Sequence, residues 1–212
     1  MVGQLGESPK QGATSKGTIA LAFTSLFAVS LVTVHVIEPE TNFGPISVYS
    51  LGPFGIVMRI GFVFLGLAFV SLAAGLRGQA RPTTLYRVDL IMLSIAGAGL
   101  VTVGAFNTDA IGTPSTLSGL IHSTAANIWS VSAIVGVLLF AIAFRQDGKN
   151  IAIGRLSRNL GIAAMITYLA GFLGLGDVQP RLFFALVVLW MSLIANQLRS
   201  GKLTQLADRE TR

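Results

Sequence analysis

The chain has 212 residues, of which 52% are hydrophobic and 11% are charged. Soluble domains contain roughly 25% charged residues, so this composition predicts an integral membrane protein. The net charge of +6 does not indicate a nucleic-acid partner, because the Lys and Arg residues lie in short segments between apolar stretches. The absence of cysteine excludes disulfides, thiolate metal sites and covalent haem attachment.

Six apolar segments are long enough to cross a bilayer, which takes about 20 residues in a helix. They cover residues 17–37, 54–76, 88–106, 118–144, 159–176 and 181–198. Residues 1–16 are polar and are predicted to be a disordered cytoplasmic tail, and residues 199–212 a second cytoplasmic tail. The sequence therefore predicts an all-α fold, a six-helix transmembrane bundle with short loops over residues 17–198.

The basic residues fall on one side of these segments. Of the fifteen Lys and Arg residues, all but Arg59 and Arg181 lie in the two tails or in the second-to-third and fourth-to-fifth connections. Short cytoplasmic segments are enriched in Lys and Arg. The pattern predicts a multi-pass protein of the cytoplasmic (inner) membrane with both termini in the cytoplasm.

Polar residues within the apolar segments gather toward the opposite, outer face. They are His35, Arg59, Asn107, Asp109, His122, Asn127, Asp177 and Arg181. Ionisable groups inside a membrane are costly and usually face the bundle interior or water. Arg59 lies about 8 Å into its helix at 1.5 Å per residue, so we expect it to form an ion pair with Glu38, Asp109 or Asp177. Arg181 is the second basic residue of this face.

His35 and His122 are at similar depth, and three roles are open for them. They can be hydrogen-bonding groups that lock helices together, or axial ligands of a b-type haem. With Asp109 they can also form a metal site or a general acid–base pair, so these three are the catalytic candidates. No H-E-x-x-H spacing supports the metal site, and no metal ligand is assigned. The identity of any other cofactor stays open.

Two further groups of polar residues have competing explanations. Ser123, Asn127 and Ser130 lie on one stripe of the fourth helix. They either serve as packing contacts or line a polar cleft between the fourth and first helices that opens to the outer leaflet. Asp89, near the inner face, is expected to pair with Arg87 or Arg155.

Two stretches resemble the bacterial and archaeal membrane family of domain of unknown function 998. The first is Glu38–Gly66, with Asn42, Ser47, Tyr49, Gly52, Pro53, Gly55 and Arg59, and the second is Phe106–Asn107–Thr108–Asp109 with Gly119–Leu120–Ile121–His122. The resemblance implies a six-helix integral membrane protein. The family is similar, more remotely, to the post-GPI-attachment factor and autophagy-modulator group of membrane proteins. This wider resemblance implies a lipid-related function. The family has no agreed activity, so it implies fold and location and no mechanism.

The leading functional hypothesis is a protein that binds or processes a lipid or amphiphile in a polar pocket at the outer leaflet. Arg59 and Arg181 would hold an anionic headgroup, and Asn42, Tyr49 and Asn127 would add ligand contacts. One alternative is a non-catalytic scaffold or accessory subunit, and another is a bis-histidine haem protein. Whether the chain is an enzyme stays open. The expected partners are membrane lipids and either a second copy or a membrane-complex subunit.

Overall fold

The computed structural model describes residues 9–39, 44–148, 150–173 and 178–203. Every regular element in these ranges is a helix, which confirms the all-α fold. Six are long: α1 Pro9–Ile37, α2 Gly55–Leu76, α3 Thr84–Ala105, α4 Leu117–Gln146, α5 Ile151–Phe172 and α6 Val178–Arg199. A short 3₁₀ helix, η2 (Ile46–Leu51), lies between α1 and α2.

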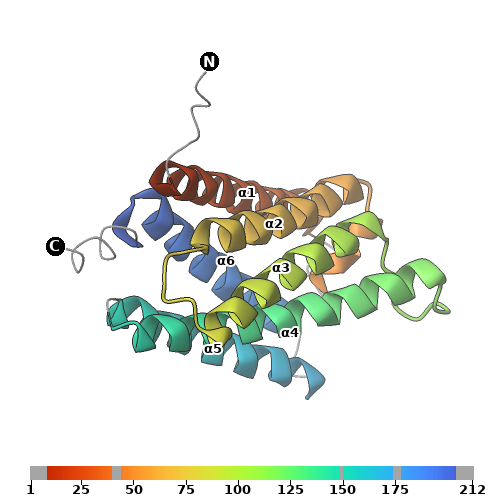
Figure 1. Ribbon diagram of the computed structural model, residues 1–212. Coiled ribbons are helices and arrows are strands. Elements are labelled where there is room, and N and C mark those ends of the chain that lie inside the picture. The colour runs from red at the N-terminus through yellow and green to blue at the C-terminus, as the bar shows by residue number, and fades with distance from the viewer. Residues whose placement is uncertain (1–8, 40–43, 149, 174–177, 204–212) are drawn as a thin grey trace.

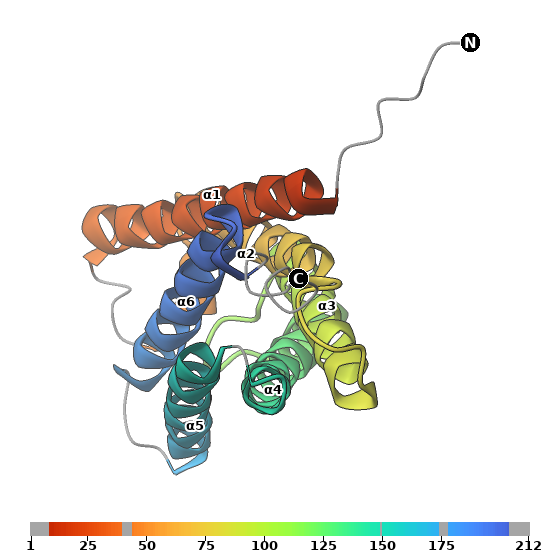
Figure 2. The ribbon, with the colours of Figure 1, turned by 60° about the vertical axis from the view of Figure 1, so that its left-hand side comes forward.

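The long helices form a closed ring in chain order. Each packs against the next, and α6 closes the ring against α1 (Figure 1 and Figure 2). Successive helices run in opposite directions, so α1 begins where α6 ends, and a methyl group at Gly17 would lie 2.6 Å from the Arg199 nitrogen. We call this the basic end, because Lys16, Arg77, Arg145 and Arg199 lie there. The opposite end, with His35 and His122, is the site end.

Aromatic side chains fill the centre of the ring. Phe184 of α6 packs against Phe27 of α1, Phe62 of α2 and Trp129 of α4, with ring centroids 5.5, 6.0 and 4.9 Å apart. These rings bury large apolar areas and prefer such offset and tilted contacts. The cluster joins four helices at mid-depth and forms the floor on which the site end is built.

Glycines bring α2 and α3 into close contact. A methyl group at Gly97 would lie 2.7 Å from the Gly66 carbonyl oxygen, and one at Gly104 would lie 2.6 Å from that of Arg59. Small residues allow membrane helices to approach this closely. The approach of Gly104 also places the end of α3 beside Arg59.

Five of the six long helices have the length and apolar composition of a membrane span. They are α1 from Gln11, α2, α3, α4 and α6. The multi-pass membrane character is therefore confirmed. Helix α5 has 22 residues but is less apolar, with Arg155 and Arg158 on its exposed side.

Two predicted boundaries were wrong. Helix α1 begins at Pro9, so residues 9–16 are not a disordered tail; Ala13 is buried against the rest of the bundle, which the polar composition did not indicate. The fifth helix begins at Ile151 and ends at Phe172, where we expected residues 159–176, because Arg155 and Arg158 interrupt the apolar run in its first turns. Residues 1–8, 174–177 and 204–212 lie outside the described ranges.

Candidate functional site

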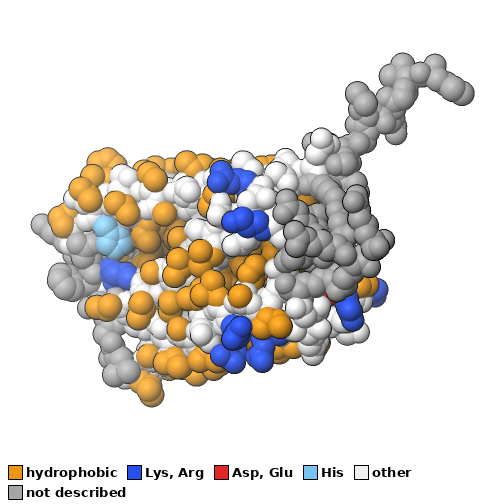
Figure 3. Space-filling view, turned by 90° about the vertical axis from the view of Figure 1, so that its left-hand side faces the viewer, with side chains coloured by type: hydrophobic (Ala, Val, Ile, Leu, Met, Phe, Trp, Pro, Cys, Tyr) orange, Lys and Arg blue, Asp and Glu red, His pale blue; other side chains and the backbone are white. Residues whose placement is uncertain are grey.

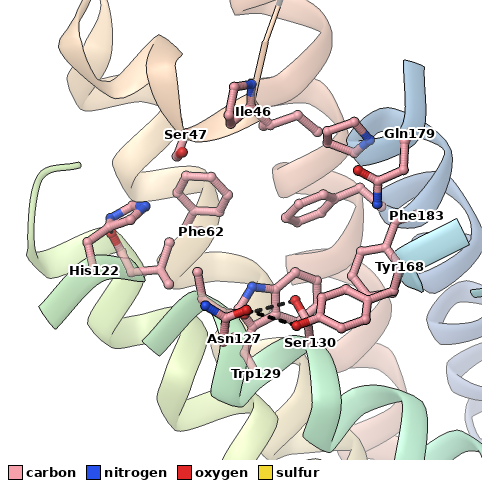
Figure 4. A pocket seen from close by; sticks show the side chains of 15 residues that line it. Ile46, Ser47, Phe62, His122, Asn127, Trp129, Ser130, Tyr168, Gln179 and Phe183 are labelled. Atoms are coloured by element: carbon pink, nitrogen blue, oxygen red, sulfur yellow. Dashed lines mark hydrogen bonds between the residues drawn. The ribbon is translucent and has the colours of Figure 1, made fainter. Parts of the chain in front are cut away.

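A pocket of about 280 Å³ lies inside the site end, between η2 and helices α2 to α6 (Figure 4). Its lining is mainly apolar and includes five aromatic side chains, Phe62, Trp129, Tyr168, Phe183 and Phe184. Its polar side chains are Ser47, His122, Asn127, Ser130, Tyr168 and Gln179. No Lys, Arg, Asp or Glu is among the described residues that line it.

His122 lies at one side of this pocket, one turn into α4 (Figure 4). Its Nδ1 is 3.1 Å from the Val103 carbonyl oxygen and 2.8 Å from that of Phe106. Carbonyl oxygens only accept, so Nδ1 carries a proton, and Nε2 of the neutral ring is an acceptor. Among the described residues Nε2 has no hydrogen-bond partner. The end of α3 thus fixes the ring and leaves one nitrogen for a ligand.

Asn127 and Tyr168 join α4 to α5 on another side of the pocket. The Tyr168 hydroxyl donates to Asn127 Oδ1 at 2.8 Å, and Asn127 Nδ2 donates to the Ser123 carbonyl oxygen at 2.9 Å. Both residues are partly accessible to solvent. Of the predicted polar stripe, Asn127 therefore contacts α5, and the pocket that Asn127 and Ser130 line includes no residue of α1, unlike the cleft that was one of the two alternatives.

A second polar group, away from the pocket lining, contains His35, Tyr49 and Arg181. The Arg181 Nε donates to His35 Nε2 at 3.2 Å, and His35 Nδ1 donates to the Leu31 carbonyl oxygen at 2.8 Å. The ring of buried Tyr49 packs on the His35 ring, with the two ring centroids 4.7 Å apart. Arg181 also donates to the Gly44 carbonyl oxygen at 3.1 Å. Figure 3 shows a histidine beside a basic side chain at the site end, within an apolar surface. This group ties α1, α6 and the segment before η2 together.

The two histidines do not fit a bis-histidine haem. Both ring nitrogens of His35 are in hydrogen bonds, and His122 lines a pocket to which His35 does not contribute. An axial ligand needs one free ring nitrogen aimed at the iron. Among the described residues, no three His, Cys, Asp or Glu side chains are grouped as metal ligands.

Arg59 stabilises the end of α3. Its Nε donates to the Gly104 carbonyl oxygen at 3.0 Å and its Nη2 to that of Ala105 at 2.9 Å. The last carbonyl groups of a helix have no partner within the helix, and the guanidinium supplies two donors in a fixed geometry. Of the three carboxylates expected to pair with Arg59, Glu38 and Asp109 do not contact it, and Asp177 lies outside the described residues.

Asp109 organises the start of α4. Its Oδ2 accepts from the Thr116 backbone N–H at 3.0 Å and its Oδ1 from the Thr116 hydroxyl at 2.7 Å, while the same hydroxyl accepts from the Gly119 N–H at 3.1 Å. These bonds from Thr116 lower the pKa of the Asp109 carboxyl below its usual value. A methyl group at Gly119 would collide with the carboxylate at 1.9 Å. Asp109 is thus part of a helix cap.

Glu38, which was expected at the outer face as a possible partner of Arg59, performs a similar task for α2. It is buried, and its Oε1 accepts from the Phe54 N–H at 2.8 Å, at the first turn of α2. A methyl group at Gly52 would lie 1.9 Å from Oε2, so the carboxylate sits directly against that turn. A carboxylate is favourable at the start of a helix. Glu38 thus supports the start of α2.

The structure therefore divides the predicted site residues among several places. His122 and Asn127 line the pocket, whereas His35, Tyr49, Arg59, Asp109 and Arg181 do not. Asn42 lies outside the described residues. Tyr168, Gln179 and the other aromatic residues of the lining were missed, because a single aromatic or amide residue in or beside an apolar segment does not indicate a site.

Comparison with known proteins gives one match. Residues 18–197 match the family described as Protein of unknown function (DUF998). No curated protein matches the chain. No solved structure matches it either.

Proposed function

The chain belongs to the DUF998 family, and from that premise we propose that it binds a membrane amphiphile with an uncharged polar part in the pocket beside His122. The observation that carries the proposal is the pocket itself, a mainly apolar space with hydrogen-bonding groups from several helices, inside a bundle of membrane spans. Ligand sites are commonly mainly apolar with a few polar groups that fix orientation.

We further propose that α5 also crosses the membrane, giving six spans of an inner-membrane protein with both termini in the cytoplasm. Its 22 residues are enough for a bilayer of ~30 Å. Arg155 and Arg158 lie near its basic end, where long basic side chains can reach water. The Lys and Arg residues of the tails and inner connections support this orientation. The pocket then belongs to the outer leaflet.

The lining chemistry defines the class of ligand. Arg59 and Arg181 were expected to hold an anionic headgroup, but neither lines the pocket. The groups that do are His122 Nε2, which accepts, and the amide side chains of Asn127 and Gln179, which donate and accept. A hydroxyl- or amide-bearing headgroup satisfies these groups without burying an unpaired charge, and the aromatic side chains of the lining suit the adjoining apolar part.

The proposal is tested by two variants of α4. His122→Asn can keep a donor toward the Val103 and Phe106 carbonyl oxygens while removing Nε2. Ala126→Phe adds a ring to the lining of the pocket. Ala152→Phe, at an exposed position of α5, is the matched control for the larger side chain.

Each protein is purified into lipid nanodiscs, and the bound amphiphiles are identified by mass spectrometry. We expect one class of neutral amphiphile in the natural chain and the Ala152→Phe control, and its loss from both pocket variants at unchanged thermal stability. If the pocket variants retain the same molecules, the proposal is wrong. If they lose only stability, the polar residues act as structural contacts, as in a scaffold.

A further inference from the structure

Asp89 lies in the interior of the bundle near the basic end and has no hydrogen-bonding partner among the described residues. It is in the second turn of α3 and its exposure is 0%. Neither Oδ1 nor Oδ2 accepts or donates a hydrogen bond. The expected partners, Arg87 and Arg155, are exposed to the outside of the bundle. The expected ion pair is therefore absent from the described structure.

The helices around Asp89 offer no compensating charge. The buried residues of α2, α5 and α6 include no Lys, Arg, Asp or Glu, and the one titratable buried residue of α4 is His122, at the other end. On its own helix, Tyr86 uses its hydroxyl to donate to the Leu76 carbonyl oxygen. Asp147, after the end of α4, has Arg81 at 3.6 Å.

A carboxylate in this position would be an isolated charge inside a membrane protein. Burying one ion costs several kcal/mol even after relaxation, and no described residue around Asp89 offsets that cost. A neutral carboxyl group costs far less, because only a polar group is then buried. Ionisable residues inside membrane proteins usually mark functional sites. Unlike Arg59 or Asp109, Asp89 supports no helix end.

We propose that Asp89 is a proton-binding site. In the closed bundle its carboxyl group holds the proton on one oxygen. Release breaks that O–H bond, gives the proton to water at the basic end and leaves a carboxylate. The carboxylate needs water or a cation, so proton release requires the basic ends of α2, α3 and α4 to separate. Proton binding closes the bundle, and proton loss opens it from that end.

The protonation state is tested by infrared spectroscopy of the full chain in lipid nanodiscs at neutral pH. Subtracting the Asp89→Asn spectrum from that of the natural chain should reveal the C=O stretch of a protonated carboxyl. The matched control is Asp109→Asn, which removes a solvent-accessible carboxylate and should reveal carboxylate bands instead. If Asp89→Asn is poorly folded, Asp89→Leu takes its place. A carboxylate band assigned to Asp89 would overturn the proposal.

The opening is tested by thiol labelling, for which the cysteine-free chain is already suitable. A cysteine is placed at Ala96, a buried position two turns further along α3. Its labelling rate with a maleimide is measured from neutral to alkaline pH, with Asp89 and with Asp89→Asn. Dividing the rate with Asp89 by the rate with Asp89→Asn removes the thiol's own pH dependence. We expect this ratio to rise with pH, and a constant ratio would overturn the proposed opening.

Discussion

The two ends of the bundle differ in the hydrogen bonding of their charged side chains. At the site end, Arg59, Glu38 and Asp109 bond to backbone groups of helix ends. Toward the basic end, Asp89 lies within a helix and has no such bond among the described residues. Helix ends leave unsatisfied N–H and C=O groups, whereas the backbone of a helix interior satisfies itself. A polar residue at a helix end therefore has a structural reason to be there, and one in the interior needs another.

Replacement of Arg59 by Met should destabilise the protein more than any other change at the site end. It removes the donors to the Gly104 and Ala105 carbonyl oxygens and leaves the end of α3 unsatisfied. We expect a loss of about 3 kcal/mol in the free energy of unfolding, for two bonds that involve a charged group. Denaturant unfolding in mixed micelles measures it. Arg59→Lys should recover part of the loss, and an unchanged stability of Arg59→Met would contradict the capping role.

Replacement of Asp89 by Leu should have the opposite sign. It exchanges a buried polar group without partners for an apolar side chain of similar reach. Replacing uncompensated buried polar groups in this way is often neutral or stabilising, and we expect a gain of about 1–2 kcal/mol. The same unfolding measurement decides it. A loss comparable to that of Arg59→Met would mean that Asp89 has a structural partner, and the contrast between the two ends would fail.

Glu38 tests whether the helix-end role extends to a buried carboxylate. Glu38→Ala removes the acceptor for the Phe54 N–H, and we expect a loss of about 1 kcal/mol, as for other caps. Glu38→Gln keeps an acceptor oxygen and should lose less. Thermal unfolding of the three proteins side by side gives the order. Equal melting temperatures for Glu38→Ala and the natural chain would remove Glu38 from the set of caps.

The fold was largely predictable, because apolar length and the placement of Lys and Arg both reflect the bilayer. Helices α2, α3, α4 and α6 begin and end within a few residues of the predicted segments. The first turns of α1 and α5 were missed because they contain polar and charged residues, which end an apolar run in the sequence but not a helix. Ala13 is buried by such packing, which no local pattern reveals.

The site was less predictable, because its partners are backbone atoms or lie on distant helices. The sequence marked Arg59 and His122 as polar residues of one face, but their acceptors are carbonyl groups at the end of α3, which carry no sequence signal. Asn127 was identified on its stripe, yet the facing residue, Tyr168, is 41 positions away. Helix rotation decides which face a residue occupies, and the period of an apolar helix does not specify it.

Asp109 gives the smallest expected effect and the one with a pH signature. Its pKa is lowered in the folded protein by the hydrogen bonds from Thr116. A carboxyl whose folded pKa is lowered contributes stability above its unfolded pKa, about 3.9 for Asp, and that contribution disappears as pH falls through the folded pKa. The difference in melting temperature between the natural chain and Asp109→Asn should therefore be constant above about pH 5 and shrink below about pH 4. Thr116→Val, which removes the shorter of the two bonds, should reduce the same difference, whereas a pH-independent difference would show that the cap does not depend on the charge of Asp109.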